Sequence, residues 1–364
     1  MPNASEAVVQ RLVRAFARAT LPRTEPQPIA VAALRRVLVV RPDDRVGDVL
    51  LTTPLLRALR EGLPHVRIDV LLAARRQVLI DGLFLADRFV PYDKRRAARN
   101  PFSFAALMRR LRQEDYDLAI DATHAVSFSL TAAVLTRATN APARIGHDRG
   151  DAARFYTHPV QVPPELRHDV AAKLKLLEPL GLKPRGLELE TSAGLLPDAV
   201  SRVEELLAEA RLERGRYIVV NPGARKADRR VAPETLARIV QRLRAATGLK
   251  ALIVWGPGEE ELAQAVWRVA GDSAVLAPPT DLHELAALLR RSALAITADT
   301  GPMHLAVACQ VPVLALFTQG DSARWGHPLP TFHAIEQADG RADLEDEVEA
   351  QALRLLDGAG VRRT

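Results

Sequence analysis

From residue 36 onward, short apolar runs alternate with longer segments whose apolar residues recur at helical spacing. The first run, Val37–Val40, is typical of a strand that is buried on both faces of a parallel sheet. A helical pattern follows it from Gly47 to Glu61. The same reasoning predicts further strands in the first half at Ile68–Leu72, Leu118–Asp121 and Ala143–Ile145, and helices near Phe104–Leu111, Ser127–Thr136 and Leu174–Leu180.

The pattern weakens over residues 182–196, which contain Pro184 and Gly186, and a second series begins after them. Its predicted strands are Tyr217–Asn221, Ala251–Trp255, Ala274–Leu276, Leu294–Thr297 and Val313–Phe317. Its predicted helices lie near Val203–Glu209, Pro233–Ala246, Glu259–Val269 and Leu282–Arg290, with a last helix at Leu344–Leu356. Two such series predict an α/β fold of two Rossmann-like, doubly wound parallel-sheet domains that face each other across a cleft.

We therefore expect four parts in the chain. They are an N-terminal basic amphipathic arm with its linker at 1–30, a first Rossmann-like domain at 31–185, a second at 195–335 and a C-terminal helix at 340–364. In the arm, Val8, Leu12 and Phe16 fall on one helical face among arginines. Such a helix can lie on a membrane surface, and a helix packed on the domain or a disordered segment is the alternative.

Composition narrows the classes of function. With 48% apolar residues, 364 residues can bury two ordinary cores. A formal net charge of +6 favours an acidic partner, but an aromatic content of 4% argues against a stacking platform for nucleic acid. The single cysteine, Cys309, excludes disulfides and cysteine-rich metal sites and indicates a cytoplasmic protein. No apolar run approaches the length of a membrane span, and no secretory signal is evident.

The first chemical candidate follows the strand Leu294–Thr297. There Asp299, Thr300 and Gly301 form a polar turn, and Pro302 stands where a helix would begin. The free N–H groups of such a helix start attract phosphate. Asp-Thr-Gly also marks aspartic proteases, but those chains are rich in β-structure. A purely structural turn is the remaining alternative.

The second candidate follows the first strand, in the segment Arg41-Pro-Asp-Asp-Arg-Val-Gly-Asp-Val-Leu-Leu-Thr-Thr-Pro. No Gly-x-Gly-x-x-Gly follows that strand and no Walker sequence occurs, so readings as a dinucleotide oxidoreductase or a P-loop NTPase lose their support. Asp48 opens a helix at the carboxyl edge of the sheet, where ligands bind in such folds. Its carboxylate is a candidate general base, and an N-cap role is the alternative.

Both motifs together resemble glycosyltransferase family 9, the ADP-heptose:lipopolysaccharide heptosyltransferases. The resemblance covers about residues 36–335 and leaves the arm outside it. Further segments between the two motifs resemble segments of the family and follow in the same order. They are Arg144-Ile-Gly-His, His168-Asp-Val with Leu176–Gly181, Asn221-Pro-Gly-Ala and Val254-Trp-Gly-Pro-Gly-Glu-Glu-Glu. The fold that it implies is GT-B-like, with acceptor bound by the first domain and nucleotide-sugar by the second, and with the C-terminal helix bracing the first domain.

The resemblance also implies roles for single residues. Asp48 matches the family's base, and Arg230 matches a lysine that balances the leaving diphosphate. The family's segment contains a Trp that is absent here, and Arg229 stands directly before Arg230. The alignment with the family's lysine is therefore uncertain by one residue. The expected donor site is completed by Gly223 and Ala224 near the phosphates, Glu259 or Glu260 at the ribose, and Asp299, Thr300, Gly301 and His304 at the phosphate. The family's Ser or Thr near Ala224 is absent here.

On the acceptor side we expect Arg45, Gly47 and His124, and a structural role for His124 is equally compatible with the sequence. The basic residues from Lys94 to Arg112 are interpreted as a solvated face, with a role at an acidic acceptor or a membrane surface as the alternative. Sequence and resemblance together predict an inverting, metal-independent and cofactor-free transfer of heptose from ADP-heptose to a lipid-linked saccharide of lipopolysaccharide type. We expect this at the cytoplasmic membrane face. The alternatives are a sugar-nucleotide epimerase or hydrolase of the same fold, and a catalytically silent carbohydrate-binding homologue.

Overall fold

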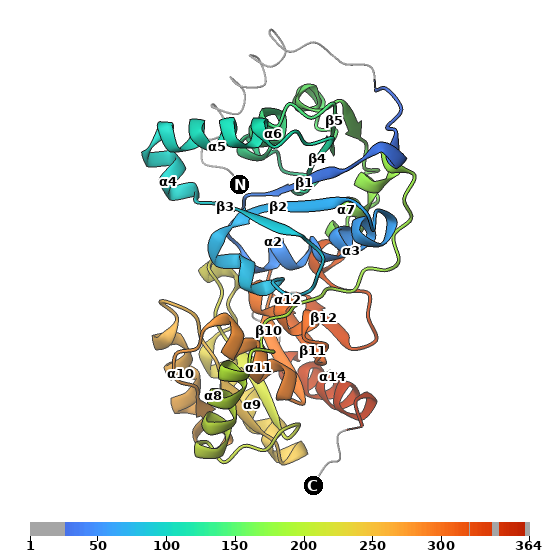
Figure 1. Cartoon of the computed structure of the whole chain (residues 1–364). Helices are drawn as coiled ribbons and strands as arrows, with labels where there is room; N and C mark the ends of the chain where they lie inside the picture. Colours follow the sequence, from blue (N-terminus) through green and yellow to red (C-terminus); the bar gives the residue numbers. More distant parts are fainter. Residues whose placement is uncertain (1–25, 320, 337–341, 361–364) are drawn as a thin grey trace. The chain divides into compact units, whose positions relative to one another are not determined.

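The computed structural model describes residues 26–319, 321–336 and 342–360 (Figure 1). Within the described residues, the chain divides into two compact units, one of residues 26–77 with 82–187, and the other of 78–81 with the described residues from 188 onward. The division after Leu187 falls inside the weakly patterned segment 182–196. The predicted helix of the N-terminal arm, at residues 8–16, lies outside the described residues.

The first unit is built on a six-stranded sheet in the order β3-β2-β1-β4-β5-β6, and every pairing is parallel. Its strands are β1 (Arg36–Arg41), β2 (Arg67–Ala73), β3 (Arg88–Tyr92), β4 (Leu118–Asp121), β5 (Ala143–His147) and β6 (His158–Val160). Val37 of the central strand pairs with Ile68 on one side and Leu118 on the other. Residues 37–40 are fully buried, as the apolar run predicts.

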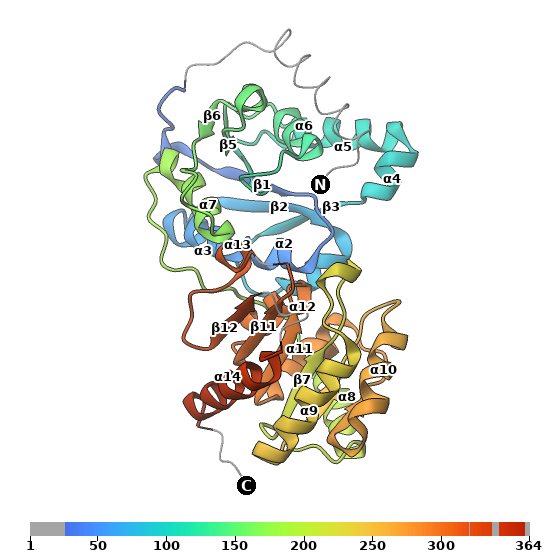
Figure 2. The same ribbon diagram turned by 180° about the vertical axis from the view of Figure 1, so that it is seen from behind.

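Helices cover both faces of this sheet (Figures 1 and 2). One face carries α5 (Pro101–Gln113) and α6 (Leu130–Ala138), with α4 (Lys94–Arg99) beside α5. The other carries α2 (Val46–Leu50), α3 (Thr53–Gly62) and α7 (Asp169–Leu174). Short 3-10 segments of this unit lie at Val31–Ala33, Gly150–Phe155 and Lys175–Leu180. A further 3-10 segment, Ala74–Leu79, begins in the first unit and ends in residues 78–81, which belong to the second.

The second unit repeats the plan with the order β12-β11-β10-β7-β8-β9. Its strands are β7 (Tyr217–Asn221), β8 (Lys250–Ile253), β9 (Ala274–Leu276), β10 (Leu294–Ala298), β11 (Val313–Phe317) and β12 (Phe332–Glu336). Its helices are α8 (Pro197–Glu209), α9 (Pro233–Thr247), α10 (Glu260–Ala270), α11 (Leu282–Arg291), α12 (Gly301–Ala308), α13 (Ser322–Trp325) and α14 (Leu344–Gly358), with 3-10 segments at Ala227–Arg229 and Gly271–Ser273. Numbered within each unit, both sheets have the Rossmann strand order 3-2-1-4-5-6.

The structure corrects the expected position of the C-terminal helix. Leu344, Val348, Ala352 and Leu356 of α14 belong to the buried core of the second unit, and the helix packs beside α9 (Figure 2). The sequence prediction that this helix braces the first domain is therefore wrong. Its apolar stripe is satisfied by the sheet that precedes it in the chain.

Among the described residues, no helix combines the length and the apolar character needed to cross a membrane.

Candidate active site

In a sheet of Rossmann order, ligands bind at the carboxyl ends of the strands where the chain order reverses. In the first unit this point lies between β1 and β4, and in the second between β7 and β10. Asp48 and His124 follow β1 and β4, whereas Gly223 and Asp299 follow β7 and β10. Residues predicted separately from the sequence therefore come together at the switch point of each sheet.

Asp48 lies in the first turn of α2, directly after the loop from β1. The N-cap of this helix is Arg45, so the alternative reading of Asp48 as an N-cap is wrong. The Asp48 side chain is 7% exposed, and its Oδ1 forms an ion pair with Arg41 Nη2 at 2.9 Å. Arg41 is itself buried at the end of β1 and donates from Nε to the Asp48 carbonyl at 3.2 Å.

A chain of contacts continues behind Asp48. His124 Nε2 lies 2.9 Å from Asp48 Oδ1, and His124 Nδ1 lies 2.6 Å from Asp169 Oδ1. Lys173, one turn further along α7, forms an ion pair with Asp169. We call these five residues, Arg41, Asp48, His124, Asp169 and Lys173, the Asp48 cluster.

The charges of the cluster fix the protonation of its members. Burial by itself would raise the pKa of Asp48, but the Arg41 guanidinium holds that pKa well below its usual range. Burial, together with the charges of Arg41 and Lys173, lowers the pKa of His124 to about 3. At neutral pH the cluster therefore holds an ionised carboxylate beside a neutral imidazole.

The loop that carries His124 is fixed by Arg149, which donates from Nε to the Ala125 carbonyl at 3.1 Å and also contacts the His124 carbonyl. Of the predicted acceptor-side residues, Gly47 and His124 are buried beside Asp48 and Arg45 is exposed. Sequence reasoning missed Arg41, Asp169 and Lys173 as partners of Asp48. For Arg41 the available signal was its position, because a charged residue at the end of an apolar strand needs a partner when it is buried.

Acid destabilisation should follow from two buried histidines of the first unit. Burial lowers the pKa of His147 well below its usual value, and within the described residues neither of its ring nitrogens has a hydrogen-bond partner. The unfolded chain binds protons at these histidines below pH 6.5, whereas folded His124 binds one only near pH 3. Stability is therefore present above about pH 6.5 and is lost as the pH falls towards the folded pKa values. We expect urea titrations to give a free energy of unfolding lower by about 2 kcal/mol for each histidine at about pH 5 than at about pH 7.5.

The variant His147→Gln should remove its share of this pH dependence. His65→Gln, at an exposed position, should leave the dependence unchanged. Equal pH dependence in His147→Gln and the parent protein would contradict the explanation.

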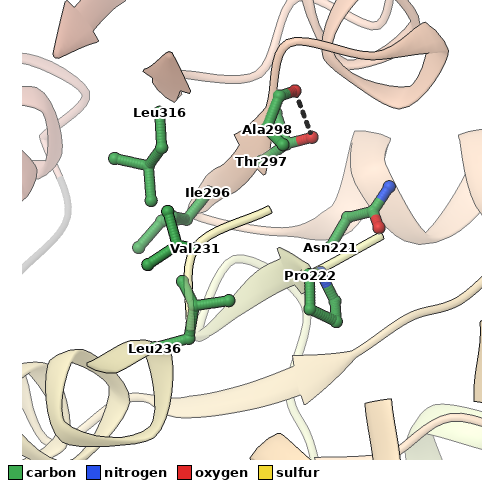
Figure 3. Close-up of a pocket in the computed structure, with 8 residues that line it drawn as sticks. All are labelled: Asn221, Pro222, Val231, Leu236, Ile296, Thr297, Ala298 and Leu316. Atoms are coloured by element: carbon green, nitrogen blue, oxygen red, sulfur yellow. Dashed lines mark hydrogen bonds between the residues drawn. The ribbon is translucent and has the colours of Figure 1, made fainter. Parts of the chain in front are cut away.

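In the second unit, α12 begins at the turn after β10. Thr300 is its N-cap and Gly301 and Pro302 are its first residues, so the predicted helix start is confirmed. Asp299, 9% exposed, accepts a hydrogen bond from Arg229 Nη1 at 2.7 Å. Burial raises the pKa of Asp299 despite that arginine. A narrow pocket lies at the ends of β7 and β10. Asn221 of β7 and Thr297 of β10 are among the residues that line it (Figure 3).

The loop after β7 is closely packed. Arg230 donates from Nε to the Ala224 carbonyl at 2.8 Å. The Gly223 N–H donates to Asn221 Oδ1 at 2.8 Å. A methyl group on Gly223 would lie 2.0 Å from Glu259 Oε2, so the Glu259 carboxylate would have to move to admit a larger residue. Glu259 also accepts from the Gly256 N–H at 3.1 Å, whereas Glu260 is exposed on α10.

His304 of α12 has a partner that the sequence did not reveal. Its Nδ1 lies 2.9 Å from Nε2 of His327, and both rings are buried. His327 in turn meets Phe332 edge to face, with centroids 5.3 Å apart. Cys309 is the C-cap of α12, and burial raises the pKa of its thiol to about 12.

We call Gly223, Ala224, Arg229, Arg230, Glu259, Asp299, Thr300, Gly301 and His304 the Asp299 site. It combines helix N–H groups, two guanidinium groups and a tight glycine loop, which is the chemistry that binds a diphosphate. Among the described residues no group of three or more histidine, cysteine, aspartate and glutamate side chains is arranged to hold a metal ion.

A family model described as glycosyltransferase family 9 (heptosyltransferase) matches residues 104–345. The chain is 28% identical to lipopolysaccharide heptosyltransferase 3 of Escherichia coli over 290 residues, which are 77% of this chain and 82% of the relative. It is 26% identical to lipopolysaccharide heptosyltransferase 1 of Pseudomonas aeruginosa over 299 residues, 78% of each chain.

Solved structures share the fold. A glycosyl transferase family 9 protein from Veillonella parvula matches with a TM-score of 0.78 at 22% identity, over 89% of this chain and 97% of that one. E. coli heptosyltransferase WaaC with ADP-2-deoxy-2-fluoro heptose matches with a TM-score of 0.65 at 22% identity, over 89% and 99%. The predicted GT-B-like fold of two Rossmann-like domains is confirmed.

Family and fold together define a glycosyltransferase. The chain belongs to glycosyltransferase family 9 (heptosyltransferase), which is the family that its sequence motifs resemble.

Proposed function

We propose that this protein transfers heptose from ADP-heptose to a saccharide acceptor of lipopolysaccharide type, with inversion at the anomeric carbon and without a metal ion. The names of its relatives support the class of acceptor. The complex of WaaC with an ADP-heptose analogue supports the donor. The observation that carries the proposal is the pair of switch-point sites, a buried carboxylate in the first unit and a glycine loop with two arginines and a helix start in the second.

In the proposed reaction the acceptor oxygen attacks the anomeric carbon of the heptose. The bond from that carbon to the phosphate oxygen breaks, and ADP leaves with the electron pair. Asp48 removes the acceptor proton, while the N–H groups at the start of α12 and the cations Arg229 and Arg230 stabilise the charge that develops on the diphosphate. Glu259, rather than the exposed Glu260, is proposed to bind the nucleotide ribose.

The proposal is tested by incubating the protein with ADP-heptose, with and without a lipopolysaccharide-type acceptor. Release of ADP should require the acceptor. ADP release or sugar isomerisation without acceptor would favour the alternative, an epimerase or hydrolase. No turnover with bound donor would favour a silent carbohydrate-binding homologue. In a thermal-shift series, ADP should stabilise the protein more than UDP or GDP, since a tighter ligand raises folding stability by mass action.

Gly223→Ala is expected to weaken ADP binding by about tenfold, which corresponds to about 1.4 kcal/mol. The added methyl group would displace the Glu259 carboxylate, which it would approach to 2.0 Å. Isothermal titration with ADP measures the effect. The same substitution in a Glu259→Ala background should add little, because both changes act on one contact. Glu260→Ala is the matched control and should bind ADP normally. Equal losses from Gly223→Ala in both backgrounds would contradict the proposed role of Glu259.

We also propose that the α4–α5 segment brings the protein to an anionic membrane surface. Exposed cations line it, and Phe102 between the two helices is 85% exposed. The exposed cations of this segment are Lys94, Arg95, Arg96, Arg99, Arg109, Arg110 and Arg112. Each cation near an anionic surface contributes about 1 kcal/mol.

The protein should therefore sediment with phosphatidylglycerol vesicles and be released by about 0.5 M salt, at which charges are screened within a few ångströms. Replacement of Lys94, Arg95, Arg96 and Arg99 by glutamine should abolish the binding. Unchanged binding in that variant would assign the cations to a merely solvated face.

A further inference from the structure

The position of His124 between two carboxylates indicates that it does more than pack beside Asp48. Its ring lies between two carboxylates, with Nε2 2.9 Å from Asp48 Oδ1 and Nδ1 2.6 Å from Asp169 Oδ1. The residue is 8% exposed. These three side chains come from the loop after β4, from α2 and from α7, so the fold assembles the arrangement from distant parts of the chain.

The hydrogen-bond chemistry of the ring decides its tautomer. Asp48 and Asp169 both accept hydrogen bonds, but Arg41 can only donate and its Nη2 contacts His124 Nε2, so Nε2 accepts and His124 donates its proton from Nδ1 to Asp169. The neutral ring then presents a lone pair at Nε2. Arg41 Nη2 lies 3.0 Å from that nitrogen and 2.9 Å from Asp48 Oδ1, so one guanidinium group orients both acceptors.

We propose that His124 receives, through Asp48, the proton that leaves the acceptor hydroxyl, and passes it on to water. This inference depends on the proposed function, in which Asp48 is the base. The acceptor O–H bond breaks as its oxygen bonds to the anomeric carbon, and ADP leaves with the electrons of the broken carbon–oxygen bond. The proton passes from the acceptor oxygen to Asp48 and on to His124 Nε2, and His124 later releases it to water.

The surrounding charges support this direction of transfer. The paired Arg41 holds the pKa of the Asp48 carboxyl well below the usual range, so Asp48 does not retain a proton. His124 Nε2 lies 2.9 Å from Asp48 Oδ1, within reach of a proton on that carboxylate. The imidazolium formed is flanked by the carboxylates of Asp48 and Asp169, which offset the opposing charges of Arg41 and Lys173.

The test separates proton transfer from structure by chemical rescue. His124→Ala is expected to lower kcat about 10²-fold, the lower end of the range for general base catalysis, with the KM for ADP-heptose unchanged. Imidazole added to this variant should restore most of the rate. 1-Methylimidazole has a similar shape but lacks the N–H that donates to Asp169, so it should restore much less. His124→Asn can hydrogen-bond to Asp48 but cannot accept the proton at a ring nitrogen, so its kcat should remain low.

The matched control is His65→Ala, at an exposed position of the same unit, which should be fully active and insensitive to imidazole. Full activity of His124→Asn, or equal rescue by both azoles, would overturn the proposal and leave His124 a structural residue. Asp48→Asn reports separately on the proposed function. If that variant is inactive while His124→Asn is active, only the proton transfer to His124 fails. If Asp48→Asn is active, the assignment of the base fails.

Discussion

Replacing Asp48 by asparagine should reduce sugar transfer by about 10²–10⁴-fold, the range expected for loss of a general base. Asparagine keeps the shape of the side chain but cannot accept the acceptor proton. The affinity for ADP should not change, because the Asp48 cluster lies in the first unit and the proposed donor contacts lie in the second. Initial rates with ADP-heptose and acceptor, together with titration of ADP, measure both quantities.

The substitution removes a charge that faces the buried Arg41, and an uncompensated buried charge can destabilise a fold. Arg41 Nη1 also pairs with Asp43 Oδ2 at 3.0 Å, which keeps one counter-charge in place. Asp43→Asn is therefore the matched control. It removes a half-exposed carboxylate from the same arginine and should retain transfer within about tenfold. Transfer that survives in Asp48→Asn, or an ADP affinity that falls with it, would contradict the assignment.

Replacing Arg230 by methionine should reduce the rate of transfer by about 10²–10³-fold, the usual loss when one stabilising group at a developing charge is removed. Arg230 donates to the Ala224 carbonyl, so its guanidinium is held at the loop after β7. Its charge should matter more in the transition state, when the diphosphate leaves, than in the bound donor. We therefore expect kcat to fall more than the affinity for ADP-heptose.

Arg229→Met tests the register that the sequence left open. Arg229 is already paired with Asp299, so its charge is partly neutralised and its removal should cost less than that of Arg230. The comparison of kcat for the two variants decides between them. A larger loss in Arg229→Met would show that Arg229 is the cation at the leaving group.

The strands of the two sheets could be predicted wherever they are buried on both faces. The predicted runs at 37–40, 118–121, 217–221 and 313–317 all lie inside strands of the structure. The missed strands β3, β6 and β12 are edge strands. β3 and β6 each contain a proline and β12 is mostly half-exposed, so none of them shows a continuous apolar run.

One predicted helix is divided in two. The pattern from Gly47 to Glu61 predicts a continuous helix, but α2 ends at Leu50 and α3 begins at Thr53. Pro54 lacks an N–H donor, which favours a helix start there. The Thr52 hydroxyl donates to the Asp48 carbonyl at 2.8 Å, a local bond that competes with the helical ladder. The break ends α2 two residues after Asp48.

The amino-acid sequence by itself determined the two βα series and placed Asp48 and Asp299 at the ends of strands. Apolar runs and turn residues act locally, so they can be read without the fold. Only the tertiary structure decided the partners of these carboxylates. Asp48 meets His124, 76 positions away, and the Glu259 carboxylate of another segment packs against Gly223. Such pairs depend on strand order and helix packing across a whole domain, which local periodicity does not encode.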